Sequence, residues 1–243
     1  MQQKAILFFL LLSTSLFSIT LSPLTQAIES KKSKHLIFTV HNPTKEPVAV
    51  DFKVLQLIDT DNNQEQRVET NKVTYYPSQF VLGANKSKKV RLRYMGTTLP
   101  EREEVYRVIA RELDIDVSDK KEEKSTTRVK ATVKMRFTYA GLLFVHKPDA
   151  IAELKLDAFE VSPSREITLH MSNSGSASVV PNALHYNYLV TIRGREYKLL
   201  DEDLKGAEFR RVLTGKSNTF YLKNIVNLPS GKIESIKIEK IVR

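Results

Sequence analysis

The chain has 243 residues, a formal net charge of +10 at pH 7 and no cysteine. Without cysteine it can form no disulfide bond and use no cysteine nucleophile, so apolar cores alone must hold its domains together. The positive charge is compatible with an acidic partner, with nucleic acid or with an anionic membrane surface.

The first 27 residues have the pattern of a secretory signal peptide. Lys4 provides a positive start, residues 6–21 are mostly apolar, and Thr25-Gln26-Ala27 fits a small-x-small cleavage site. We expect cleavage after Ala27, because serine and threonine interrupt the apolar stretch and a membrane span needs roughly 20 apolar residues. A retained membrane anchor is the alternative. Export argues against nucleic acid as the partner.

Alternating apolar and polar residues, which are typical of β-strands, dominate the chain after residue 35. Asparagine and proline within residues 41–47 favour a hairpin turn, and the polar residues 59–71 and charged residues 114–127 predict loops. Residues 104–113 also have helical propensity, but their two-residue alternation favours a strand. In this half of the chain we expect strands over residues 36–40, 48–54, 73–76, 80–82, 90–94, 104–113 and 128–139.

A second series of short strands follows an apolar run that ends at Pro148. Asparagine, glycine, serine and proline turns separate these strands, as in antiparallel sandwiches. We expect strands over residues 153–159, 167–172, 183–192, 196–199, 218–222 and 233–241. The sequence therefore predicts an all-β fold of two immunoglobulin-like β-sandwich domains, residues 28–148 and 149–243, after a signal peptide over residues 1–27.

No arrangement of residues predicts catalysis. The segment NSGSAS at residues 173–178 lacks the G-x-S-x-G spacing of a hydrolase and fits a turn. No histidine pair has the spacing of the HExxH metal-binding motif. The histidines are scattered singly at positions 35, 41, 146, 170 and 185. We therefore predict a binding protein without catalytic residues, metal or cofactor.

Three motifs in the first domain, taken together, carry a family resemblance. They are YPSQFVL at residues 76–82, KKVRL at 88–92 and LPEREEVYRV at 99–108. This combination resembles the first domain of the periplasmic chaperones that assemble pili through the chaperone–usher pathway. The forms EEVYRV and YAGLLF resemble the alternate branch that serves class 5 or common-pilus-type fimbriae. The match covers about residues 36–148.

The resemblance implies two immunoglobulin-like domains set at an angle, no cofactor, and a periplasmic location. It also implies that the chain binds one pilin (fimbrial) subunit and releases it to an outer-membrane usher. Self-association of the empty chaperone is left open. The rival hypothesis is a structural or adhesive exported protein whose basic surface binds anionic glycans or lipid headgroups.

The segment RVKATVKMRFTY at residues 128–139 occupies the position where the family keeps a strand that it lends to the subunit. Such a strand pairs with the open edge of the subunit, and alternate side chains fill its groove. The residues that would enter the groove are Ala131, Val133, Met135, Phe137 and Tyr139. The alternative is that these residues pack the core of their own domain.

The resemblance also implies a pair of cleft cations that hold the carboxylate at the subunit's C-terminus. Cleavage after Ala27 would truncate the first strand, which would carry one cation, and the position of the other is taken by Leu143. We therefore consider Arg136 and Lys134, with Lys32 as a remote third, because a charge-assisted bond to a carboxylate is strong. A solvated basic face is the alternative reading.

An ion pair between the domains is a further implication of the resemblance. Glu103 and Lys147 are the residues at the matching positions. We expect this pair to fix the angle between the domains more than to add stability, since exposed pairs contribute little free energy.

Overall fold

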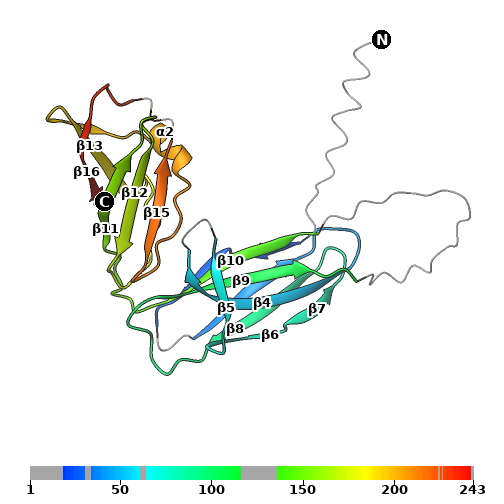
Figure 1. The fold of residues 1–243 in the computed structure, drawn as a ribbon. Helices are drawn as coiled ribbons and strands as arrows, with labels where there is room; N and C mark the ends of the chain where they lie inside the picture. Colours follow the sequence, from blue (N-terminus) through cyan, green and yellow to red (C-terminus); the bar gives the residue numbers. More distant parts are fainter. Residues whose placement is uncertain are drawn as a thin grey trace, which may run out of the picture.

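The computed structural model describes residues 19–30, 34–60, 64–115, 136–223, 225 and 227–241. These residues form two β-sandwiches set at an angle, with the connection between strands β10 and β11 as the joint (Figure 1). The predicted domain boundary after Pro148 falls within this connection. The helix predicted as an alternative over residues 104–113 is absent there, since strand β9 occupies Glu104–Glu112.

Two sheets build the first domain. One has the strand order β1-β3-β8-β6, and the other has the order β2-β10-β9-β4-β5, with β7 paired to β4. The strands are β1 (Thr20–Ser22), β2 (Thr25–Ile28), β3 (His35–His41), β4 (Val48–Asp59), β5 (Gln66–Glu69), β6 (Val73–Tyr76), β7 (Gln79–Leu82), β8 (Ser87–Tyr94), β9 and β10 (Thr138–Val145).

The core of the first domain follows from the alternation of its strands. In β8, Val90, Leu92 and Tyr94 are buried while the residues between them are exposed. Residues of the same kind on β3, β4, β9 and β10 meet them between the two sheets. Asn42 closes one end of this core: its side-chain amide, fully buried, donates to the carbonyls of Glu46, Leu82 and Gly83.

Residues 19–28 belong to the first domain, although we expected residues 19–27 to be removed with the signal peptide. β1 pairs with β3, and β2 runs parallel to β10. Ile19, Leu21 and Ile28 lie in the core with at most 4% of their surface exposed. β1 and β2 form a first strand that cleavage after Ala27 would truncate. The site of cleavage itself stays a prediction. In the described part of the chain, no helix is long and apolar enough to cross a membrane.

Two predicted elements of the first domain are corrected. The polar segment 59–71 contains β5, which pairs with β4 and has no buried residue, so no apolar alternation marks it. The strand predicted over residues 128–139 is placed differently: residues 128–135 lie outside the described residues, and β10 begins only at Thr138 and includes most of the apolar run that follows.

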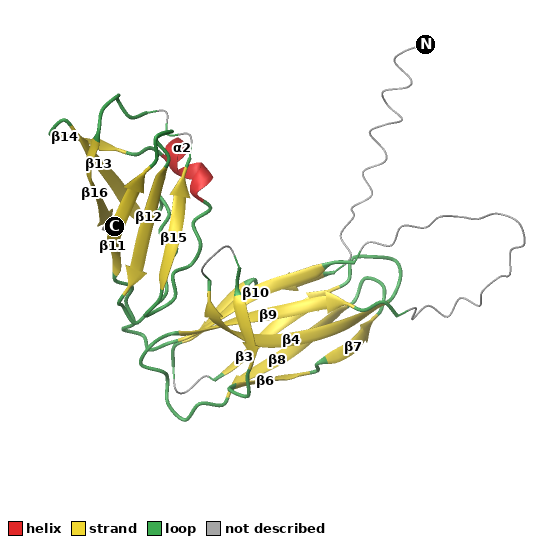
Figure 2. Ribbon diagram, viewed as in Figure 1, coloured by secondary structure: helices red, strands yellow, loops and turns green. Residues whose placement is uncertain are grey.

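Two smaller sheets, β11-β12-β15 and β14-β13-β16, enclose the core of the second domain. Its elements are β11 (Leu154–Val161), β12 (Ile167–Asn173), β13 (Tyr186–Ile192), β14 (Arg195–Lys198), helix α2 (Asp201–Leu204), the 3-10 turn η1 (Lys205–Ala207), β15 (Ser217–Leu222) and β16 (Ile233–Lys240). Strands dominate both domains, with α2 as a short exception (Figure 2). The all-β, two-domain prediction is confirmed.

Candidate functional site

Strand β10 has a partly open edge. It pairs with β9 along its whole length, from Thr138 to Val145. On its other side β2 pairs only with residues 142–145, and Leu142 donates its backbone N–H to the carbonyl of Leu24 at 2.7 Å. Within the described part of the chain, residues 138–141 therefore have no strand on that side. Their backbone groups can pair with a strand from another chain.

The faces of β10 are clearly divided. Leu143 and Val145 are buried in the core of the first domain, and Tyr139 packs against that core. Of the five predicted groove residues, Tyr139 thus packs its own domain, and Phe137 is half-buried just before the strand. The other three, Ala131, Val133 and Met135, lie outside the described residues. All five have odd numbers, so a straight continuation of β10 would place them on the side of Tyr139.

Of the residues predicted to anchor the carboxylate, Arg136 does not lie in the cleft between the domains. Arg136 forms an ion pair with Asp114, just beyond the end of β9. It lies at the start of β10, and the eight residues of this strand put about 23 Å between its ends. Since the chain enters the second domain after the other end of β10, Arg136 is remote from the cleft. Lys134 and Lys32 lie outside the described residues.

Two other arginines do lie at the cleft, one from each domain. Arg107 of β9 pairs in register with Leu142 and is held by both carboxylate oxygens of Glu65, with Nε 3.0 Å from Oε2. Arg211, from the second domain, lies over the ring of Phe144 at 4.6 Å. Such a cation–π contact is favourable where water is partly excluded.

The electrostatics of these arginines are set by their neighbours. Burial by itself raises the pKa of Glu65, but hydrogen bonds from Arg107 and Arg67 outweigh it and hold the pKa below its ordinary 4.5. Burial lowers the pKa of Arg211, and the carboxylate of Glu103 opposes this shift. The cleft therefore holds two guanidinium groups that are both compensated by carboxylates of the chain itself.

The cleft between the domains has both apolar and polar walls. Apolar side chains from both domains meet in it, and beside them is a hollow of about 310 Å³. The apolar residues are Leu57, Val105, Leu142 and Phe144 from the first domain and Leu213 from the second. The alternation of β9 places Arg107 opposite Tyr106 and Val108 but does not show that it lies at the cleft, and no sequence motif marks Arg211.

The predicted pair of Glu103 with Lys147 is not formed. Lys147 contacts Glu101 instead, with Nζ 2.5 Å from Oε2. Glu103 accepts hydrogen bonds from the backbone N–H and the hydroxyl of Ser178 in the second domain. Burial explains the difference, because the Glu103 side chain is 6% exposed in the interface and that of Glu101 is 83% exposed.

Further polar contacts join the domains on the same side. Thr60 donates its hydroxyl to the carbonyl of Arg211 at 2.5 Å, and Asn218 donates to that hydroxyl at 3.1 Å. The Arg211 guanidinium donates to the Ser178 hydroxyl at 3.1 Å. Contacts of this kind are directional, so they define the angle between the domains more than they add free energy.

We expect Glu103→Ala to loosen the angle between the domains. The substitution removes both bonds to Ser178 and the charge that compensates Arg211, while the core of each domain is untouched. The chain has no native cysteine, so spin labels can be attached at Lys89→Cys and Lys198→Cys, one in each domain. Double electron–electron resonance then measures the distance between the two labels. The distance distribution should broaden, and each domain should keep its unfolding free energy within about 1 kcal/mol.

Glu101→Ala is the matched control for this experiment. It removes the same charge two residues away, but only an exposed contact to Lys147. If it broadens the distance distribution as much as Glu103→Ala does, the assignment of the hinge to Glu103 is incorrect.

Solved structures of chaperones, some of them from fimbriae or pili, have the same fold. The class 5 fimbriae chaperone CfaA is 15% identical, with a TM-score of 0.51, over 93% of this chain and 100% of that chain. DraB, an E. coli chaperone, is 16% identical, with a TM-score of 0.52, over 93% and 97%. A chain of the CsuC–CsuE chaperone–tip adhesion subunit complex from Acinetobacter baumannii is 16% identical, with a TM-score of 0.53, over 84% and 90%. At these identities the likeness establishes the fold.

No curated protein matches the sequence significantly. The model of the family described as pili and flagellar-assembly chaperone, PapD N-terminal domain, matches residues 19–151. It begins at Ile19, in agreement with the place of β1 and β2 in the fold. The match covers more than half of the 243 residues, and the chain therefore belongs to this family of assembly chaperones, which are not enzymes.

Proposed function

We propose that the chain is a periplasmic chaperone that binds pilin subunits by lending them a strand and delivers them to an outer-membrane usher. The observation that carries the proposal is the open edge of β10 at residues 138–141, which directly follows the alternating segment 128–137. The proposal includes export by a signal peptide that ends before Ile19, since residues 19–28 are needed for the fold.

The mechanism follows from the physics of an incomplete sandwich. A subunit that lacks one strand exposes unpaired backbone groups and an apolar groove, and both promote aggregation. Residues 129–141 would pair with the open edge, while Val133, Met135 and Phe137, with Ala131, fill the groove. Tyr139, which packs against the core of the first domain, would fix the lent strand to the chaperone.

The anchor for the subunit's carboxylate is part of the same proposal. Arg107 and Arg211 lie at the cleft, whereas Arg136 lies at the far end of β10 and Lys134 precedes it. We favour the arginines in the cleft, because guanidinium groups bind carboxylates through two parallel bonds and a client carboxylate could replace Glu65.

The proposal is tested by co-expression with pilin subunits and capture of the complex from the periplasm. Val133→Glu with Met135→Glu, and the triple variant that adds Phe137→Glu, should abolish capture, because each places a charge in an apolar groove. Thr132→Glu with Thr138→Glu is the matched control, since it adds two charges on the other side of the same segment. This control should retain capture.

Capture by a folded triple variant, or an equal loss in the control pair, contradicts the strand-lending mechanism. The rival function predicts a different result. A chain that captures no subunit but binds anionic polymer, with binding lost as salt is raised, would be an adhesive protein for anionic surfaces.

A further inference from the structure

A second site lies at the tip of the second domain, on the hairpin formed by β13 and β14. The hairpin lies at the end of this domain remote from the first domain (Figure 1). A hollow of about 330 Å³ there is lined by Ile192, Arg193, Arg195, Tyr197, Pro229 and Ser230. It is independent of the β10 edge and of the cleft, so it stays accessible when both are occupied.

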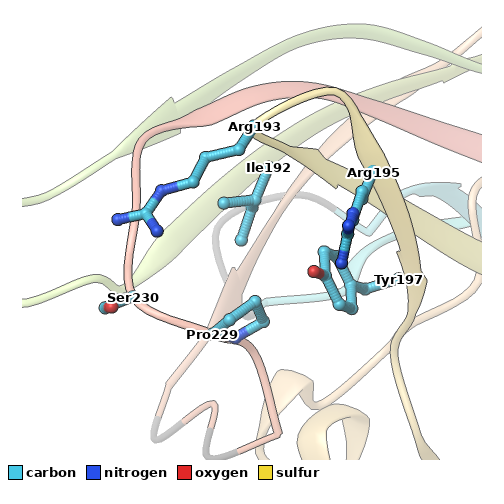
Figure 3. Close-up of a pocket in the computed structure, with 6 residues that line it drawn as sticks. All are labelled: Ile192, Arg193, Arg195, Tyr197, Pro229 and Ser230. Carbon is cyan, nitrogen blue, oxygen red and sulfur yellow. The ribbon is translucent and has the colours of Figure 1, made fainter.

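The lining has a charged rim and an apolar floor. In Figure 3, Ile192 points into the space between the side chain of Arg193 and the neighbouring side chains of Arg195 and Tyr197, with Pro229 below. Ile192 is 1% exposed, while both arginines are exposed. The six lining residues include no carboxylate. Within the described residues neither arginine has an ion-pair partner.

The backbone conformation at Arg193 is one that arginine rarely adopts. Arg193 and Gly194 form a two-residue hairpin loop with φ values of 50° and 69°. Asparagine followed by glycine is the preferred pair in such a turn, and a long side chain in the left-handed region is unfavourable. An unfavourable residue held in place by its surroundings suggests a role for the side chain itself.

The opposite wall of the hollow is built to approach the hairpin closely. A Cβ at Gly231 would lie 2.6 Å from Cγ2 of Ile192, so glycine allows the turn after Pro229 to come near. Arg165 donates from Nη2 to the carbonyl of Pro229 at 2.7 Å, which holds this turn. Glu234 accepts the backbone N–H of Gly194 at 3.1 Å, which holds the hairpin.

Charged residues on β14 also have a simpler use. Exposed charges on a short edge strand prevent it from pairing with other chains. That use explains Arg195, Glu196 and Lys198 equally well. It does not explain two unpaired guanidinium groups around a hollow whose floor is apolar, nor an arginine at the left-handed position of the turn.

We propose that this hollow binds an acidic segment of a partner protein, with one carboxylate between the two arginines and an adjacent apolar side chain against Tyr197 and Pro229, which are accessible in the lining. Guanidinium groups recognise carboxylates and phosphates through paired hydrogen bonds. The apolar floor favours a ligand that carries an apolar group next to its charge, which inorganic phosphate does not. A hollow of about 330 Å³ accommodates a few side chains of a peptide.

The experiment titrates the ¹⁵N-labelled protein with the acetylated peptide Glu-Leu-Glu-Leu-Glu and measures the amide shifts and the Kd. Shifts should concentrate on the hairpin and on Ser230. Arg193→Asn with Arg195→Gln should weaken binding about tenfold or more, because two charge-assisted contacts are lost. Asparagine suits the left-handed turn, so this variant should keep or raise the Tm, which separates loss of binding from loss of fold.

Lys205→Gln with Lys240→Gln is the matched control, since it removes two exposed charges elsewhere on the same domain. It should change the Kd by less than about twofold. If the lysine control weakens peptide binding as much as the arginine variant does, the loss reflects net charge alone, and the proposed site is wrong. Arginine-dependent binding of phosphatidylglycerol vesicles or of inorganic phosphate, with no binding of the peptide, would overturn the protein ligand in favour of a phosphate group.

Discussion

A chain that begins at Ile28 is expected to lose the folded first domain. It lacks β1 and most of β2, and with them Ile19 and Leu21 from the core. Burial of such a side chain contributes about 1.5–3 kcal/mol. The loss of pairing with β3 and β10 adds to this cost. The total of about 5 kcal/mol or more equals the whole stability of many domains.

The measurement compares two chains expressed without a signal peptide, one that begins at Ile19 and one that begins at Ile28. The longer chain should unfold cooperatively, whereas the shorter one should bind a hydrophobic dye or aggregate. The mass of the exported protein provides an independent check, because it should include residues 19–27. Equal unfolding free energies for the two chains would show that these residues are dispensable.

The strands of both domains could be predicted because their apolar residues alternate. β8 and β9 are examples, since each has one face in the core. The same signal did not reveal strand β1. Ile19 and Leu21 alternate as in a strand, but they directly follow an apolar run with the pattern of a signal peptide, and Thr25-Gln26-Ala27 fits a cleavage site. Only the pairing with distant strands separates the two readings.

The polar contacts of the site were less predictable than the strands. Glu101 and Glu103 have the same charge and lie two residues apart, and only the packing of Ser178 decides which of them is buried. Arg107 comes from one domain and Arg211 from the other, and their proximity depends on the angle between the domains. Local sequence patterns do not predict contacts between residues that lie this far apart in the chain.

The groove residues show a further limit. Their alternation was visible in the sequence, but the side that they occupy stays a prediction, because Ala131, Val133 and Met135 lie outside the described residues. If they share the side of Tyr139, which packs against the core of the first domain, the lent side chains would extend the row of core residues into the subunit. The lent strand would connect the two cores directly.

Glu104→Ala is expected to destabilise the first domain by about 2–4 kcal/mol. The Glu104 carboxylate accepts hydrogen bonds from the hydroxyls of Tyr106 at 2.5 Å and Tyr94 at 3.2 Å, and it pairs with Lys72. Both tyrosines are buried, so removal of the carboxylate leaves two hydroxyl donors unpaired in the interior. Urea unfolding at pH 7 measures the change. Glu101→Ala, which removes an exposed charge, should cost less than about 1 kcal/mol.

The destabilisation caused by Glu104→Ala should depend on pH, because the Glu104 carboxylate also shifts the pKa of the tyrosines that it binds. Burial, and next the charge of Glu104, raise the pKa of Tyr94 from its ordinary 10 to about 12, and the pKa of Tyr106 is raised too. The folded state therefore holds these protons more tightly than the unfolded chain. The resulting stability is complete below pH 10 and is lost as the pH rises through 12.

Without Glu104 the pKa of Tyr94 should fall, because its carboxylate no longer opposes the phenolate. The variant then loses less stability between pH 10 and 12 than the unchanged protein does. The difference in unfolding free energy between the unchanged protein and the Glu104→Ala variant should therefore be largest at neutral pH and shrink as the pH rises from 10 to 12. A difference that stays constant up to pH 12 would mean that Glu104 contributes by packing and not by its bonds to the tyrosines.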